Sequence, residues 1–257
     1  MAQAVRGAVT RAPWTPPPLR SVLAGLLVFA VLGVFGYVLQ SLLGPGSHPI
    51  RKVSVEGDFR YLTPGYIQSL VAASLQGGFF DVDVQMIRGR LLEEPWIFDA
   101  TVERLWPDVL RVAIVEQVPT ARWGPHALLN AAADVYAPAP SSIPTGLPTL
   151  NGPIGSEVEV LARYREIAAQ LRALQLEVAT VSLSERGAWT VGLRDQTQLV
   201  IGRRYIEQRL ARFTAVFAPW LKPQWSNIAS IDLRYTNGFA VQERSPVAAV
   251  APTDKRS

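Results

Sequence analysis

The most constraining feature of the chain is the segment 21–43, which contains no charged side chain. As an α-helix this segment is about 35 Å long, enough to cross a hydrocarbon core of about 30 Å. Its leucine, valine and phenylalanine side chains contribute on the order of −4 to −8 kcal/mol on the membrane-insertion scale, as an upper bound. We therefore predict a transmembrane helix over residues 21–43.

The alternative for this segment is a cleavable signal peptide, whose apolar region is usually shorter and ends at a small-x-small site. Here the apolar run is too long, and the residues that follow, 44–49, lack an A-x-A pattern. Arg6, Arg11 and Arg20 carry the only charges before the segment. The positive-inside bias therefore predicts that residues 1–20 are cytoplasmic and that the chain after the helix is exported.

The charge of the exported part argues against nucleic-acid binding. Of the 25 Lys and Arg residues, three precede the predicted helix, which leaves 22 basic against 21 acidic residues, a net charge of +1. The basic excess is therefore a topology signal and not a surface for a polyanion. The chain has no cysteine and two isolated histidines, His48 and His126, so we expect no metal site. We also expect no cofactor, no small-molecule substrate and no catalysis.

The first exported residues have the pattern of a small α/β domain. Alternating residues 52–56 predict a strand, and Thr63-Pro64 and Asp83 predict the starts of two helices, the second of which ends at Glu94-Pro95. Two strands, 97–105 and 109–117, then flank a Trp106-Pro107-Asp108 turn. The order β-α-α-β-β predicts a three-stranded sheet with two helices on one face, as in a POTRA domain. Trp96, Trp106 and Trp123 are interpreted as core and turn residues.

After Pro119 the pattern changes to short β-like runs at 121–123 and 135–136 and a proline-rich loop region. Helices are expected over 157–174 and 205–217, with strands near 178–183, 189–193 and 198–201. Two last strands, about 228–235 and 239–242, flank Thr236-Asn237-Gly238, a hairpin signal. The fold class expected is α+β: a transmembrane helix, a POTRA domain and a C-terminal mixed α/β domain whose antiparallel sheet ends in an edge strand. The expected divisions are 1–20, 21–43, a linker 44–49, a POTRA domain 50–119, a C-terminal domain 120–244 and a flexible tail 245–257.

Several of these features together resemble one family, FtsQ, the bitopic division protein of Gram-negative bacteria, related to DivIB. The basic tail, the single span and the POTRA-like start come first. The run from Trp106-Pro107 through Glu116 and Pro119 to Trp123 resembles the family's W-P-x-x-L-x-V-x-I-x-E-x-x-P-x-A-x-W pattern. Gly202-Arg203, the segment 209–213 and the segment 231–235 follow in the order typical of the family.

The resemblance implies a non-enzymatic scaffold in the inner membrane at the division septum, which helps control septal cell wall synthesis. It implies recruitment of FtsB and FtsL, with the terminal strand pairing with FtsB, and contacts of the membrane and POTRA parts with FtsK and FtsA. An edge strand offers unpaired N–H and C=O groups to such a partner. The expected partner-binding residues are Arg186, Arg234, Tyr235, Thr236, Asn237, Gly238, Phe239, Ala240 and Val241. Gln242-Glu243-Arg244 stands where family members often carry an aromatic residue.

Two other functions are considered. A POTRA-containing transport or assembly protein normally ends in a β-barrel, and the chain has no succession of ten-residue amphipathic strands. A membrane-anchored hydrolase of the cell wall needs a nucleophile–base or paired-carboxylate arrangement. The pairs Glu93-Glu94 and Asp81-x-Asp83 are better explained by helix ends and solvated faces.

Overall fold

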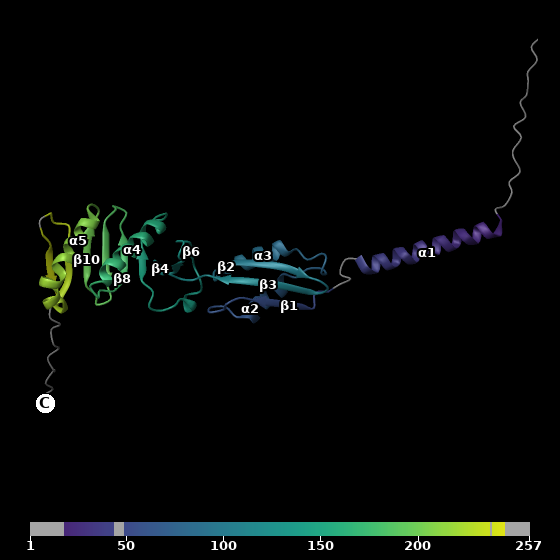
Figure 1. Ribbon diagram of the computed structural model, residues 1–257, viewed down its shortest axis with the longest axis horizontal. Coiled ribbons are helices and arrows are strands. Elements are labelled where there is room, and N and C mark those ends of the chain that lie inside the picture. The colour runs from purple at the N-terminus through teal and green to yellow at the C-terminus, as the bar shows by residue number, and fades with distance from the viewer. Residues whose placement is uncertain (1–17, 44–48, 237, 245–257) are drawn as a thin grey trace, which may run out of the picture.

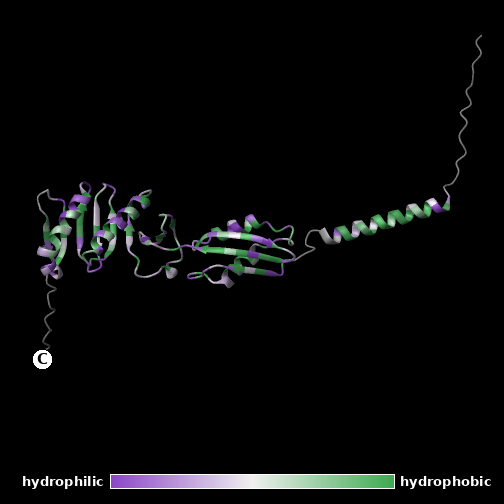
Figure 2. Ribbon diagram, viewed as in Figure 1, coloured by the Kyte–Doolittle hydropathy of each residue, from purple (hydrophilic) through white to green (hydrophobic). Residues whose placement is uncertain are grey.

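The computed structural model describes residues 18–43, 49–236 and 238–244 (Figure 1). Helix α1 (Leu19–Leu43) contains the predicted transmembrane segment, and its described side chains are exposed. It is apolar along most of its length (Figure 2), and among the described residues it alone is long and apolar enough to cross a membrane. Nearly all of the predicted tail 1–20 and linker 44–49, and the whole tail 245–257, lie outside the described residues.

The domain that follows α1 has the predicted β-α-α-β-β order, and its three strands pair in the order β1-β3-β2. Strand β1 runs parallel to β3, and β2 runs antiparallel to it. Both predicted helix caps are present: the Thr63 hydroxyl accepts from the Tyr66 N–H, and the Asp83 carboxylate from the N–H groups of Gln85 and Met86. The elements are β1 (Lys52–Glu56), α2 (Pro64–Ser74), α3 (Val84–Leu92), β2 (Ile97–Leu105) and β3 (Val109–Glu116).

A core of its own stabilises this domain. Ile67 and Val71 of α2, Ile87 of α3 and Leu110 and Val112 of β3 are completely buried. The helices therefore cover the sheet through the apolar stripes that their sequences display at helical spacing.

The C-terminal domain is built on a nine-stranded sheet with the order β12-β11-β10-β9-β8-β7-β4-β5-β6. The α+β class is confirmed, but the sheet is mixed and not antiparallel as predicted, because β4–β7, β7–β8 and β10–β11 are parallel pairs. Parallel neighbours need a crossover connection, which α4 and α5 supply for β7–β8 and β10–β11. The elements are β4 (Ala121–Trp123), β5 (Ala127–Leu129), β6 (Val135–Tyr136), β7 (Thr149–Asn151), α4 (Glu157–Arg172), β8 (Val178–Leu183), β9 (Trp189–Leu193), β10 (Gln198–Gly202), α5 (Ile206–Val216), β11 (Ile228–Asp232) and β12 (Ala240–Glu243).

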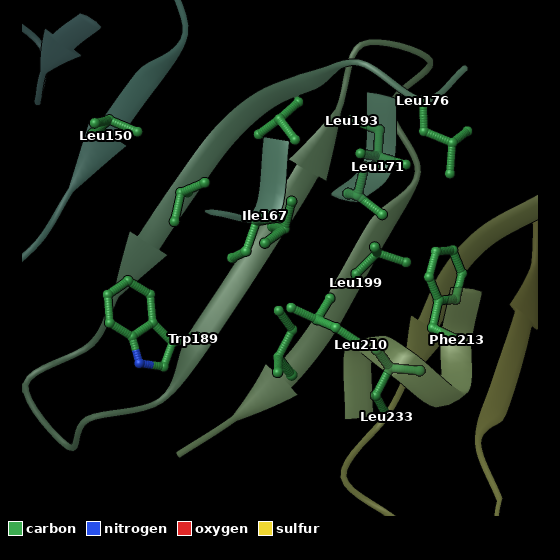
Figure 3. Close-up of a cluster of buried hydrophobic side chains, with 14 of the residues drawn as sticks. Leu150, Ile167, Leu171, Leu176, Trp189, Leu193, Leu199, Leu210, Phe213 and Leu233 are labelled. Carbon is green, nitrogen blue, oxygen red and sulfur yellow. The ribbon is translucent and has the colours of Figure 1, made fainter. Parts of the chain in front are cut away.

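The core of this domain lies between the sheet and the two helices (Figure 3). Ile167 and Leu171 of α4 and Leu210 and Phe213 of α5 face strand residues such as Leu199. All five side chains are at most 1% exposed. The shared core therefore joins the neighbouring strands β7, β8, β9, β10 and β11, and β12 lies at the edge of the sheet next to β11.

Candidate functional site: an open sheet edge beside an arginine-lined cavity

Strand β12 forms one edge of the nine-stranded sheet. It pairs antiparallel with β11, with Asp232 opposite Ala240 and Ile231 opposite Val241. All four of its residues are exposed, and no other described strand pairs with its outer side. The outward backbone groups of such a strand can accept a further strand. At the opposite edge lies β6, which has two residues.

Arg244 fixes the end of β12 to the body of the domain. Its Nη2 donates to the Asp195 carbonyl oxygen at 2.6 Å and to the Thr197 hydroxyl at 3.1 Å, and its Nε donates to the Ile228 carbonyl at 3.0 Å. The Asp195 carboxylate in turn accepts the Trp225 indole N–H at 2.5 Å. These contacts hold the edge strand in place without using its outer side.

The ionised form of Asp195 is stabilised despite its surroundings. Burial acts to raise the pKa of this carboxyl, but the Thr197 N–H, the Trp225 indole and the Arg244 guanidinium together hold the pKa below its usual value. The Arg244 side chain therefore lies beside a fixed negative charge, which strengthens the attachment of β12.

The connection between β11 and β12 is longer than the sequence pattern predicts, because β11 ends at Asp232 rather than near Tyr235. Two arginines of α5 bind the carbonyl oxygens that follow. Arg209 Nη2 donates to the Arg234 carbonyl at 2.9 Å, and Arg212 donates to the carbonyls of Tyr235 and Thr236. These carbonyls are thereby removed from the strand ladder. Asn237, the central residue of the predicted turn, lies outside the described residues.

The two aromatic residues expected at the site differ in exposure. Tyr235 is 57% exposed, whereas Phe239 is partly buried and packs against the core of the domain. Val241 on β12 is 40% exposed. The apolar surface that this edge offers to a partner therefore comes from Tyr235 and Val241 more than from Phe239.

A cavity of about 420 Å³ adjoins the same end of the sheet, and five arginines line it. Two of them are engaged within the domain: Arg234 forms an ion pair with Asp232 at 2.6 Å, and Arg209 Nη1 donates to the Ile201 carbonyl at 2.6 Å. The hydrogen bonds from Arg234 are the main cause of the lowered pKa of Asp232. The other three form no hydrogen bond or ion pair through their side chains within the described residues: Arg186, Arg203 and Arg204. The cavity therefore presents uncompensated positive charge.

Gly202 forms part of the cavity wall and leaves no room for a side chain. Its φ of +84° lies in the left-handed region, and a Cβ atom there would lie 2.8 Å from Arg209 Nη1 and 3.0 Å from Arg234 Cγ. A glycine is therefore required both by the backbone and by the two arginines.

We expect Gly202→Ala to destabilise the protein by about 1–2 kcal/mol from the backbone conformation alone, with a further cost from displacing Arg209 and Arg234. Gly187→Ala is the matched control, because Gly187 also has a positive φ of +74° but its Cβ would meet only Arg203 Cβ at 4.0 Å. Thermal unfolding of the full chain in detergent should show the larger loss for Gly202→Ala. Equal losses in the two variants would mean that the arginines move aside freely.

The structure brings together residues that are distant in the sequence. Arg186, in the β8–β9 turn, and Arg234, after β11, line the same cavity. Ala240 and Val241 lie on β12, while Tyr235, Thr236, Gly238 and Phe239 lie in the connection before it. Sequence reasoning missed Arg203, Arg204 and Arg209 as cavity residues and Arg244 as the attachment of β12. The family-like segments Gly202-Arg203 and 209–213 were the sequence signals that could have pointed to Arg203 and Arg209.

Two family models match the chain. The model described as "POTRA domain, FtsQ-type" matches residues 48–117, and "Cell division protein FtsQ/DivIB, C-terminal" matches residues 121–234. The chain is similar to cell division protein FtsQ of Xanthomonas campestris, with 35% identity over 224 residues, which cover 87% of this chain and 80% of the relative. The chain belongs to the FtsQ family of cell division proteins.

Further FtsQ relatives cover the chain to a similar extent. Cell division protein FtsQ of Allochromatium vinosum is 34% identical over 224 residues, 87% of this chain and 89% of the relative. That of Coxiella burnetii is 30% identical over 221 residues, 84% of this chain and 91% of the relative. Membership of the FtsQ family supports a scaffold role in the division machinery.

Among the described residues, no group of His, Cys, Asp and Glu side chains is arranged to hold a metal ion.

Proposed function

We propose that this FtsQ-family chain is a non-enzymatic, single-pass scaffold of the inner membrane at the division septum, with a cytoplasmic N-terminus and its two domains in the periplasm. It recruits FtsB and FtsL and so helps control septal cell wall synthesis. Strand addition of an FtsB segment to β12 is the central contact of this proposal. The transmembrane and POTRA parts contribute contacts with FtsK and FtsA.

The observation that carries the proposal is the exposed outer side of β12, held in place by Arg244 and flanked by Tyr235. Main-chain hydrogen bonds of an added strand supply affinity, and side-chain pockets supply specificity. The arginine-lined cavity supports the proposal further, because Arg186, Arg203 and Arg204 can attract acidic side chains that flank the added strand. The positive-inside bias of Arg6, Arg11 and Arg20 supports the orientation.

A photo-crosslinking amino acid placed in β12 tests this proposal in cells. We expect a crosslinker at Val241 to capture FtsB, and one at Val135 on the opposite edge strand β6 to capture none. The two valines are a matched pair, because both lie on edge strands and are 40% and 47% exposed. Capture of FtsB from Val135 but not from Val241, or from neither, would contradict strand addition at β12.

A further inference from the structure

Trp106, in the turn between β2 and β3, is unusually exposed for a tryptophan. Its exposed fraction is 75%, and its indole N–H donates no hydrogen bond within the described residues. The sequence pattern predicted a turn residue here, and the structure confirms the turn, but the turn itself gives no reason for so large an aromatic side chain in water. Tryptophan is enriched at positions where one end of the side chain contacts apolar groups and the other end contacts water, as at membrane interfaces.

The strand register places Trp106 beside the point where the chain arrives from α1. Lys52, the first residue of β1, pairs with Val109, and the Arg51 N–H donates to the Asp108 carbonyl at 2.9 Å. Trp106 lies two residues before Asp108 in the sequence. The start of β1, the end of β2 and the start of β3 therefore share one end of the POTRA domain (Figure 1), which we call the tip: residues 49–52, 75–83 and 104–109.

A second aromatic side chain is exposed at the tip. Phe80 is 49% exposed, and Arg104 Nη1 donates to its backbone carbonyl at 3.1 Å, which joins the loop after α2 to the end of β2. The neighbouring Phe79 is 6% exposed and contacts Phe80 edge to face. The buried Phe79 ring therefore attaches this loop to the domain. The tip thus presents two aromatic rings on a supported surface.

Charges at the tip cancel. Three basic residues are balanced by three acidic residues: Arg51, Lys52 and Arg104 against Asp81, Asp83 and Asp108. Asp83 caps α3, and Asp108 Oδ2 lies 3.9 Å from Arg51 Nε. Electrostatic attraction to anionic lipids therefore cannot be the main attachment. Any contact of this surface with a membrane must rest on the aromatic rings.

The tether to α1 is short. Six residues, 44–49, separate Leu43 from Ile50. Covalent geometry limits six residues to about 20 Å even in a fully extended chain. A helix of 25 residues is about 37 Å long and exceeds a hydrocarbon core of about 30 Å, so its end reaches the interfacial region. A short tether gives an effective concentration in the millimolar range, so even a weak contact is largely occupied.

We propose that the tip docks on the lipid–water interface next to α1, with Trp106 and Phe80 inserted among the headgroups. Because the attachment is aromatic, it needs no anionic lipid. The docking restricts the orientation of the POTRA domain relative to the membrane. It does not depend on FtsB binding or on which side of the membrane the domain occupies.

Fluorescence quenching by brominated lipid tests the proposal on the full chain in nanodiscs of zwitterionic phosphatidylcholine brominated near the headgroup. The chain has seven tryptophans and none in α1. Trp14, which precedes α1 in the sequence, is replaced by phenylalanine in every sample so that it cannot contribute. We expect the brominated lipid to quench part of the remaining emission, and Trp106→Phe to abolish that quenching.

Trp220→Phe is the matched control, because Trp220 is 71% exposed but lies between α5 and β11 of the C-terminal domain. This control should keep the quenching in full, and high salt should not reduce it. Quenching that is absent from the parent, or that persists in Trp106→Phe, would overturn the proposal.

Discussion

Val241→Asp is expected to weaken binding of FtsB about 30- to 800-fold, corresponding to about 2–4 kcal/mol for a central residue of an interface. Val241 lies in the middle of β12 and is 40% exposed, so the free domain tolerates a polar side chain there. In the complex, an added strand would cover the new carboxylate and remove its water. A desolvated charge without a partner is costly, and this cost falls on the complex alone.

The matched control is Val135→Asp on the opposite edge strand β6, which places the same charge on a valine of similar exposure. Affinities for an FtsB segment, measured by titration against the full chain in detergent, should fall for Val241→Asp and remain within about twofold for Val135→Asp. Thermal unfolding of both variants should stay close to that of the parent. A well-folded Val241→Asp protein that still binds FtsB normally would refute strand addition at this edge.

Local signals in the sequence predicted much of the fold. The uncharged run predicted α1, and the capping residues Thr63 and Asp83 predicted the starts of α2 and α3. The alternating residues on either side of Trp106-Pro107 predicted β2 and β3. These elements depend on neighbouring residues or on a single apolar face. Their periodicity is therefore visible without knowledge of the tertiary structure.

The missed elements are those defined by distant partners. Strands β5 and β7 have three residues each and are defined by their pairing, β5 with β4 and β6, and β7 with β4 and β8. Strand β7 also lies in a proline-rich stretch that the sequence pattern marks as a loop. The early end of β11 results from Arg209 and Arg212 of α5, which bind the following carbonyls. No pattern within residues 228–235 indicates that these carbonyls bind arginine side chains instead of a neighbouring strand.

The candidate site shows the same division. The hairpin signal and the family resemblance led to residues 234–241, but the arginine-lined cavity needs four parts of the chain to meet. Arg203 and Arg204 follow β10, Arg209 lies on α5, and Arg186 lies in the β8–β9 turn. Only the parallel pairing of β10 with β11 places Arg234 beside them, and that pairing is not visible in the sequence.

Trp96→Ala is expected to destabilise the protein by about 3–5 kcal/mol and to loosen the joint between its two domains. Trp96 is 3% exposed and stacks on Tyr61, with 3.9 Å between the ring centroids. Trp96 also contacts the C-terminal domain: the Tyr136 ring meets it edge to face, with 5.6 Å between the ring centroids, and its indole N–H donates to the Ser142 hydroxyl at 3.0 Å. Together with the buried Leu128, these side chains form a small core between the domains.

The polar part of the joint should matter less than the ring. Ser142→Ala removes two hydrogen bonds, the one from the Trp96 indole and the one that the Ser142 hydroxyl donates to the Ala139 carbonyl at 2.8 Å, and should cost about 1–2 kcal/mol. Trp96→Phe should fall between Ser142→Ala and Trp96→Ala, because it keeps an aromatic ring. Burial raises the pKa of the Tyr136 hydroxyl, so this ring stays neutral and apolar over the working range of pH. The joint therefore rests on packing, and truncation of its central ring leaves a cavity.

The absence of cysteine allows a direct measurement of the joint. Spin labels on Gln85→Cys of α3 and Glu159→Cys of α4, two exposed positions, report the distance between the domains. We expect a narrow distance distribution in the parent, a broad one in Trp96→Ala, and an unchanged one in Trp220→Ala, which removes an exposed tryptophan outside the joint. An equally narrow distribution in Trp96→Ala would show that the segment linking β3 to β4 holds the domains without this core. A broad one would show that a single buried ring keeps the open edge at β12 in a fixed orientation relative to the POTRA domain.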